Sequence, residues 1–287
     1  DVVLRHFIFE FFFGVNSTLL LLDKYIEGNC YAVYFPNAAV VDGGGIIIKG
    51  NTLRVAGDDR GMESAVCVYA VALKNGGYFD VENNTMSAVN GIFFWVLATV
   101  SSAGLLRVAD CEFFESTDVF ESALVYLSGS VTLEGGAQCR VEGNSVSAAS
   151  ILSISLSKQK MRLSGSGTTV VLANNRQVDS RAFFAKFLPS SIVFTSPARF
   201  VVGCNLKGNE EVSYDYVFPE GVVVFRCGTC NDDAACYMPG TESVDRGSCS
   251  CSCKDGWHGA SCLPLEVPDA VVPPCRREPS TATRAAW

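Results

Sequence analysis

A short pattern recurs along the chain up to Asn205 and constrains the fold more than any other feature: an aliphatic residue, two further residues, then Asn or Cys. Successive copies start 22 to 33 residues apart. Periods of this length are typical of solenoids, propellers and other repeat arrays. The copies lie at residues 26–29, 48–51, 81–84, 108–111, 141–144, 172–175 and 202–205.

The residues around each copy predict strands. In most copies another apolar residue lies two positions before the aliphatic one, which is the alternation of a β-strand. Second apolar runs, at 65–73, 91–99, 123–127, 151–156 and 183–188, lie between the copies. A coil of roughly 30 residues with two or three short strands is the unit of a parallel β-helix, in which stacked coils share one core. We therefore predict an all-β fold with a right-handed, pectate-lyase-like parallel β-helix over residues 1–221. An irregular β-sandwich is the alternative.

The recurrent Asn predicts a ladder at one corner of the coil. Asn tolerates the left-handed αL conformation and can hydrogen-bond its own backbone. Stacked in register, these side chains can also bond to one another. Cys111 replaces Asn in one copy, which is acceptable because a small thiol is tolerated in a buried corner.

The hydrophobic content and net charge of the chain limit the classes of partner that it can bind. Hydrophobic residues make up 48% of the chain and the net charge is −8, which indicates a well-filled core and disfavours nucleic acid as a partner. No apolar run reaches the ~20 residues that a membrane-spanning helix needs. We expect any anchor to lie outside this chain, which starts at Asp1 and reads as a fragment or processed form.

Thirteen cysteines indicate an oxidising compartment. Nine of them fall between Cys204 and Cys275, a density typical of a disulfide framework. The odd total leaves at least one thiol unpaired or paired outside the chain.

The sequence CSCKDGWHGASC at residues 251–262 resembles the end of an EGF-like module in its cysteines, its two glycines and its aromatic residue. That resemblance assigns residues 222–264 to an EGF-like module. It implies three disulfides: Cys230–Cys249, Cys236–Cys251 and Cys253–Cys262. The prolines and the composition of residues 265–287 predict a Pro-rich linker and a disordered tail. Cys227 is then a seventh cysteine and a candidate partner for Cys204. Cys249 lies closer to Cys251 than such modules usually show.

Zinc is the competing interpretation of these cysteines, because Cys227-x2-Cys230 and the run 249–253 could supply thiolates. The C-x-C-x-C spacing is unusual for zinc, so we predict no metal and no cofactor.

Catalytic residues are sparse. Polysaccharide-cleaving β-helices use paired carboxylates, and the one acidic pair with a basic neighbour in the β region is Asp58, Asp59 and Arg60. Its flanking glycines favour a charged turn. We expect no enzymatic activity, and a polysaccharide lyase or hydrolase centred on this cluster is the alternative.

Two N-glycosylation sequons begin at Asn16 and Asn83. A glycan on Asn83, beside the predicted ladder, would need that corner to be exposed.

The segments VVGCN (201–205), VSYD (212–215), 217–246 and 249–262 together resemble the dispersed gene family protein 1 family, very large surface proteins of trypanosomes. The resemblance implies a β-helical ectodomain, an EGF-like module and membrane spans further downstream. The residues after Pro274 depart from the family pattern, which raises the hypothesis of a truncated pseudogene product.

These features predict a protein of the extracellular side of the cell surface with an adhesion or structural role. Host-cell or matrix proteins, or glycans, are the expected partners. An antigenic coat without a specific ligand is a further alternative.

Overall fold

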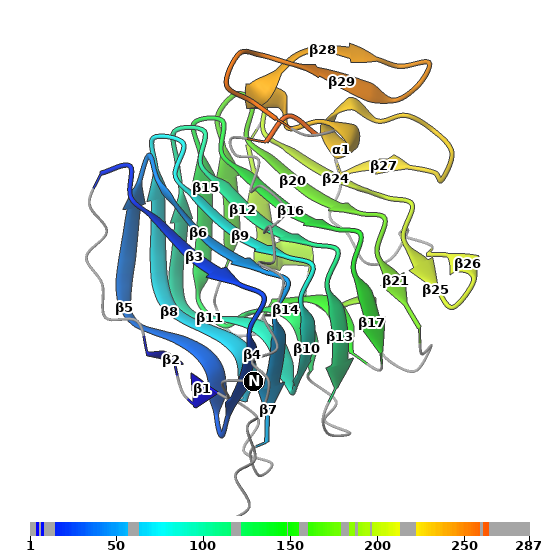
Figure 1. Ribbon diagram of the computed structural model, residues 1–287. Helices are drawn as coiled ribbons and strands as arrows, with labels where there is room; N and C mark the ends of the chain where they lie inside the picture. The colour runs from blue at the N-terminus through cyan, green and yellow to red at the C-terminus, as the bar shows by residue number, and fades with distance from the viewer. Residues whose placement is uncertain are drawn as a thin grey trace, which may run out of the picture.

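The chain forms a parallel β-solenoid that carries a disulfide-rich region at its C-terminal end (Figure 1). The computed structural model describes residues 4–5, 7–8, 15–56, 63–115, 122–147, 149–154, 160–178, 184–186, 189–195, 197–212, 222–258 and 261–263. The predicted all-β solenoid is therefore confirmed, and the β-sandwich alternative is wrong because the long sheets are built from parallel neighbours.

Three sheets run along the solenoid. Sheet A contains β1 (Leu4–Arg5), β4 (Tyr25–Gly28), β7 (Thr52–Val55), β10 (Thr85–Ala88), β13 (Glu112–Glu115), β17 (Ser145–Ser147), β21 (Arg176–Gln177), β25 (Leu206–Lys207) and the antiparallel β26 (Glu210–Glu211). Sheet B contains β2 (Phe7–Ile8), β5 (Tyr31–Asp42), β8 (Ser64–Lys74), β11 (Asn90–Val100), β14 (Ala123–Leu127), β18 (Ser150–Ile154) and β22 (Ala185–Lys186), with β15 (Ser130–Glu134), β19 (Met161–Ser164) and β23 (Ile192–Phe194) as a branch from β11. Sheet C contains β3 (Thr18–Leu22), β6 (Gly45–Lys49), β9 (Tyr78–Glu82), β12 (Leu105–Ala109), β16 (Gln138–Glu142), β20 (Thr169–Ala173), β24 (Arg199–Gly203) and β27 (Val223–Phe225).

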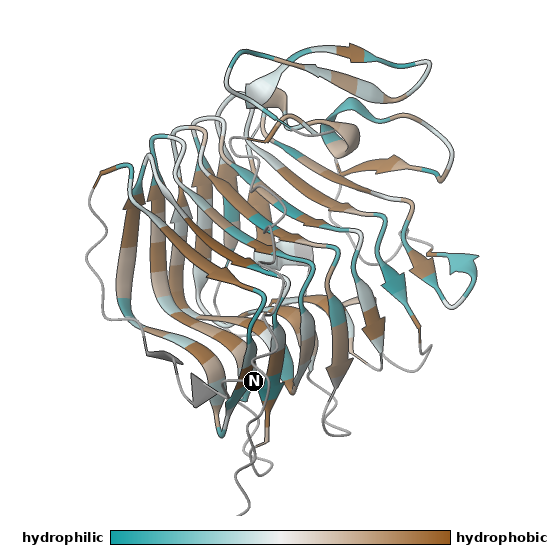
Figure 2. Ribbon diagram, in the orientation of Figure 1, coloured by the Kyte–Doolittle hydropathy of each residue, from teal (hydrophilic) through white to brown (hydrophobic). Residues whose placement is uncertain are grey.

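Where the structure describes them, the second apolar runs of the sequence form strands of sheet B, as predicted: β8, β11, β14, β18 and β22. Hydrophobic residues, brown in Figure 2, recur along these strands. Their aliphatic side chains are buried in one continuous core that all three sheets share. Within it Phe79 meets both Phe35 and Phe94 edge to face, with ring centroids 6.0 and 6.1 Å apart. This is a favourable geometry for aromatic pairs.

The Asn ladder forms along the end of sheet C. The Nδ2 atom of Asn144 donates to Oδ1 of Asn175 at 2.9 Å, and Nδ2 of Asn175 donates to Oδ1 of Asn205 at 2.9 Å. Each Asn also donates to backbone carbonyls, so its buried amide is satisfied. At Cys111 the ladder weakens, because Nδ2 of Asn84 reaches only the Sγ atom at 4.0 Å.

Two details of the predicted ladder are wrong. The αL residue is not the ladder Asn but the residue before it, for example Asn83 and Asn174 with φ of 52° and 56°. The copy at 26–29 is also out of register, since Ile26 lies on sheet A opposite Leu53. The true first copy is Leu21, which pairs with Ile48 and places Lys24 at the Asn position. Tertiary stacking, not sequence similarity, selects that register.

The C-terminal region, which we call the cysteine module, spans residues 222–258 and 261–263 of the described chain. It contains α1 (Asp232–Ala235), a 3₁₀ turn at Met238–Gly240 and a hairpin of β28 (Thr241–Asp245) and β29 (Ser250–Cys253). A further 3₁₀ turn, Pro189–Ser191, precedes β23. β27 lies within the module and pairs in parallel with β24, so it adds the last rung to sheet C. None of the described helices is long and apolar enough to cross a membrane.

Candidate functional site

Four disulfides hold the cysteine module. Three join Cys230 to Cys249, Cys236 to Cys251 and Cys253 to Cys262, the pairings that the EGF-like resemblance implies. The fourth ties Cys204, beside the last ladder Asn, to Cys227. Because these eight sulfurs are bonded in pairs, none of them is a thiolate available to zinc. Four cysteines of the described chain are free: Cys30, Cys67, Cys111 and Cys139.

The module packs on the outward face of sheet C, which is usually the solvated face of a sheet. Tyr237 lies between the solenoid and Trp257, and its hydroxyl donates to the carbonyl of Ala103 at 2.7 Å. The apolar residues of this contact are Leu22, Ile47, Tyr78, Leu105, Tyr237, Trp257 and Leu263. A second contact joins Val171 and Ala173 of β20 to Ala234 and Phe225.

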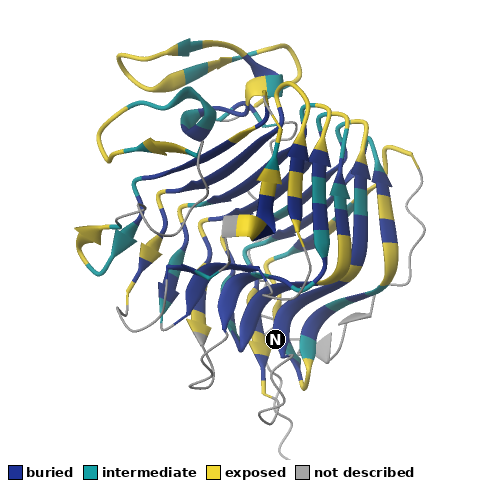
Figure 3. Ribbon diagram, turned by 180° about the vertical axis from the view of Figure 1, so that it is seen from behind, coloured by how far each residue is buried: buried dark blue, intermediate teal, exposed yellow. Residues whose placement is uncertain are grey.

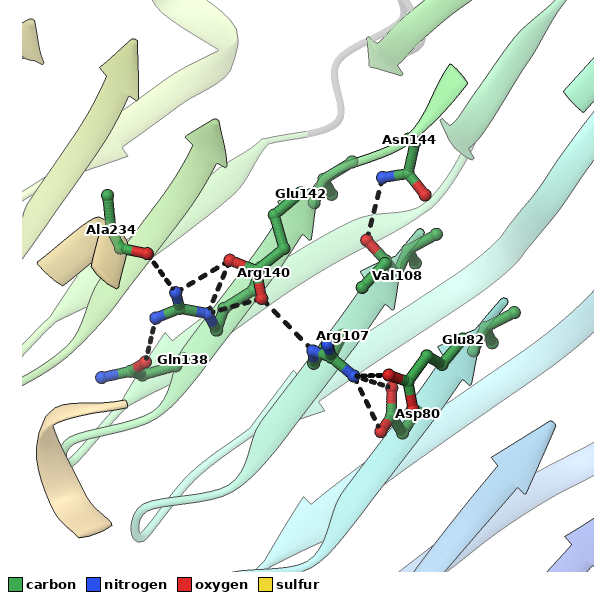
Figure 4. Close-up of polar contacts among 12 residues, drawn as sticks. Asp80, Glu82, Arg107, Val108, Gln138, Arg140, Glu142, Asn144 and Ala234 are labelled. Atoms are coloured by element: carbon green, nitrogen blue, oxygen red, sulfur yellow. Dashed lines mark hydrogen bonds and ion pairs between the residues drawn. The ribbon is translucent and has the colours of Figure 1, made fainter. Parts of the chain in front are cut away.

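Arg140 links the two parts through its guanidinium, which is fully buried (Figure 4). Nη1 donates to the carbonyls of Asp233 at 2.9 Å and Cys236 at 3.1 Å, and Nη2 donates to that of Ala234 at 2.7 Å. These carbonyls end α1 and have no partner within so short a helix. Nη2 also forms an ion pair with Glu142 at 2.8 Å. Nη1 donates to Oε1 of Gln138 as well, at 3.4 Å. One buried cation therefore connects the carbonyls of the module to side chains of β16.

Arg107 extends this cluster to the preceding coils (Figure 4). Its Nε atom lies 3.2 Å from Glu142, and Nη1 lies 3.2 Å from Asp80 and 3.5 Å from Glu82. Burial raises the pKa of Asp80 to about 6, although Arg107 opposes the shift. Burial also acts to raise the pKa of Glu142, but Arg140 and Arg107 outweigh it and lower that pKa. Arginine–carboxylate pairing stabilises these buried charges, so the cluster serves structure.

The outward face of sheet B presents the candidate binding surface. We call it the aromatic face and define it by Tyr69, Phe93, Trp95, Leu97 and Tyr126. Phe93 and Tyr126 are register partners with stacked rings 5.4 Å apart, and Trp95 meets Tyr69 edge to face at 6.1 Å. Tyr69 is 40% exposed, Trp95 37% and Leu97 42%, whereas Tyr126 is half-buried and Phe93 is buried, at 5%. In Figure 3 exposed segments interrupt the long strands that are otherwise buried.

A bulge creates this exposure. The register of β11 against β8 shifts between Phe94 and Leu97, so Trp95, Val96 and Leu97 all point away from the core. Gly129 of the next coil accommodates the bulge, since a Cβ atom there would lie 2.0 Å from the carbonyl oxygen of Val96.

Two further rows of the same face carry polar residues. In one row, Thr99 pairs with Thr132 and Thr132 with Arg162. In the other row, Leu97 pairs with Ser130. The residue after Ser130, Val131, donates its backbone N–H to the carbonyl of Lys160, so Lys160 lies beside Ser130 on the next coil. Lys160 and Arg162 are both exposed. The aromatic face thus continues, coil by coil, into hydroxyl and then basic side chains.

The remaining predicted sites have different outcomes. Asn16 and Asn83 are exposed in turns with positive φ, so both sequons are accessible, and their glycosylation stays a prediction. Asp58, Asp59 and Arg60 lie outside the described residues, as do the tail 265–287 and Cys275.

Sequence reasoning missed the charged cluster and the aromatic face. Asp80, Arg107 and Arg140 each precede the aliphatic residue of a repeat copy, so aligning the copies would have placed them on adjacent rungs. An alignment of the second apolar runs would likewise have placed Phe93 beside Tyr126.

Residues 163–263, which cover the last coils and the cysteine module, match the family model of the DGF-1 N-terminal domain. No curated protein and no solved structure matches the chain.

Proposed function

Since residues 163–263 place the chain in the DGF-1 family, we propose that it is a cell-surface protein that binds partners outside the cell through its aromatic face. Its role is adhesion, without catalysis. The cysteine module is EGF-like and fixes the C-terminal end of a rigid rod.

The exposed aromatic face carries this proposal. Soluble proteins rarely expose contiguous apolar patches unless the patch binds something. Trp and Tyr are also enriched among the residues that contribute most to binding energy. Tyr69 and Trp95 belong to strands hydrogen-bonded on both sides, so the surface is already ordered before binding. Such preorganisation lowers the entropy cost of association.

The disulfide pattern supports both the location and the EGF-like assignment. In the order 230, 236, 249, 251, 253 and 262, the six cysteines pair first with third, second with fourth and fifth with sixth. Bridges of this density persist in oxidising environments such as the cell surface.

The test is binding of the oxidised whole chain to host cells and to immobilised matrix proteins, with Trp95→Ala as the variant. Phe114→Ala is the matched control, because Phe114 is an aromatic side chain of sheet A that is 47% exposed. We expect saturable binding that Trp95→Ala weakens and Phe114→Ala preserves, with equal thermal unfolding of the three proteins. Absence of saturable binding by the parent chain would contradict adhesion and favour an antigenic coat.

A further inference from the structure

The aromatic face leads into basic residues on a protein of net charge −8. Among the described residues of its three outward rows, the charged side chains are Lys160, Arg162 and Lys186, all basic. Among the described residues, acidic side chains first appear in the next row, at the ends of the strands. That row contains Asp42 and Glu134 together with the basic Lys74. A local basic patch on an acidic chain favours an anionic partner.

We propose that this face binds an extended acidic polysaccharide that lies along the solenoid axis; the proposal rests on the adhesion function above. Three kinds of contact succeed one another along the rows. Tyr69 and Trp95 offer apolar rings to the faces of the sugars, Thr99 and Thr132 offer hydroxyls to their hydroxyls, and Lys160 with Arg162 meets their acid groups. Arg and Lys form charge-assisted hydrogen bonds with such oxyanions.

The spacing of the solenoid suits a polymer. Adjacent rungs lie about 4.8 Å apart, which is close to the length of one sugar ring in an extended chain. A linear polysaccharide can therefore repeat its contacts from one coil to the next.

An extended acidic peptide fits this face less well. Peptides that bind to sheets usually add a strand at an open edge, through main-chain hydrogen bonds. The strands β8, β11, β15 and β19 each have a neighbour on both sides, so no edge is open there. Side chains alone must hold the ligand, and a polysaccharide needs only side chains.

The experiment measures binding of the oxidised whole chain to heparin and to hyaluronate, with neutral dextran and poly-glutamate for comparison. The variant is the double charge reversal Lys160→Glu/Arg162→Glu. The matched control, Arg54→Glu/Arg176→Glu, makes the same change of net charge on exposed residues of sheet A. Trp95→Ala and Phe114→Ala form a second pair, and thermal unfolding verifies that each variant is folded.

We expect saturable binding to at least one acidic polysaccharide and none to dextran. The Lys160/Arg162 reversal should weaken binding about tenfold or more, while the sheet A reversal leaves it nearly unchanged. Trp95→Ala should weaken binding as well, and raised salt should reduce it.

Three results would overturn the proposal: no binding to either acidic polysaccharide, equal loss in the two charge reversals, or equal binding of poly-glutamate with no effect of Trp95→Ala. A cell-binding assay distinguishes an error in the polysaccharide assignment from an error in the adhesion function. If cells still bind the parent chain after enzymatic removal of their acidic glycans, adhesion stands and the polysaccharide assignment is wrong. If cells never bind it, adhesion itself is wrong.

Discussion

Single residues decide how well the ladder of sheet C is satisfied. Asn84 Oδ1 accepts from both the backbone N–H and the Nδ2 of Asn51, at 2.9 and 3.0 Å. Cys111 offers Asn84 only a thiol, which is a weak acceptor. The backbone of Cys111 still follows the ladder, because its N–H donates to Asn144 Oδ1 at 3.0 Å.

Cys111→Asn should therefore complete the ladder. An asparagine there can accept both donors of Asn84, and one net hydrogen bond stabilises a protein by about 1 kcal/mol. The free energy of unfolding in urea, under conditions that keep the disulfides intact, measures the gain. Cys139→Asn is the control. Cys139 lies in the apolar core between Leu106 and Val170, so an amide there should cost about 2 kcal/mol. Equal effects of the two substitutions would count against the ladder as the cause.

At the scale of elements, an outward row of sheet C carries one charged side chain on each of β9, β12 and β16. Asp80, Arg107 and Arg140 are register neighbours, and Glu142 bridges the two arginines. The row is buried where a solenoid face is commonly wet. Its carboxylates consequently differ in pKa, upward at Asp80 and downward at Glu142.

Asp80 should make stability fall as the pH rises. Its pKa is about 6 in the folded chain against the ordinary 3.8, so the folded state holds the proton more tightly between these values. Relative to Asp80→Asn, the parent chain should lose stability from about pH 4 to about pH 6 and change little above that. Urea unfolding of both proteins across this range measures the difference.

Glu142→Gln should show the opposite pH dependence of stability. The pKa of Glu142 is lowered in the folded chain, so the stability that its carboxylate contributes is lost as the pH falls. A difference between parent chain and Asp80→Asn that does not change with pH would refute the assignment.

At the scale of the whole molecule, the solenoid and the cysteine module are joined in three ways. The apolar contact around Tyr237, the Cys204–Cys227 disulfide and the β27 rung each cross between them. Arg140 adds a polar anchor at the centre of the contact. The module is thus fixed against the rod rather than tethered by a linker.

Arg140→Ala should loosen the module. The substitution leaves three buried carbonyls without their donor and removes one of the two arginines that pair with Glu142. Breaking a buried pair costs about 3–5 kcal/mol. Arg199→Ala is the matched control: Arg199 also reaches α1, through Asp233 at 2.9 Å, but its side chain is 61% exposed. Such a surface pair contributes about 0–1 kcal/mol. Hydrogen exchange at α1 and β29 measures both, and equal protection in the two variants would contradict the role of Arg140.

Much of the fold could be predicted from the sequence. Alternation of apolar residues identified the strands of sheet C, and the apolar runs between the repeat copies identified those of sheet B. Burial on one face is a local property of a strand. The ladder from Asn51 to Asn205 followed from one repeated residue, and the resemblance to EGF-like modules implied the three bridges that the structure forms.

Only the tertiary structure decided what stacks on what and which faces are covered. Leu21, not Ile26, begins the ladder, because the register of a coil depends on the loop lengths between its strands. Alternation places Arg140 and Trp95 alike on outward faces. The path of the chain then buries Arg140 beneath Ala234, 94 residues away, and leaves Trp95 exposed on a bulge. The strand pattern thus determines which way a side chain points, while long-range packing determines whether protein or solvent meets it.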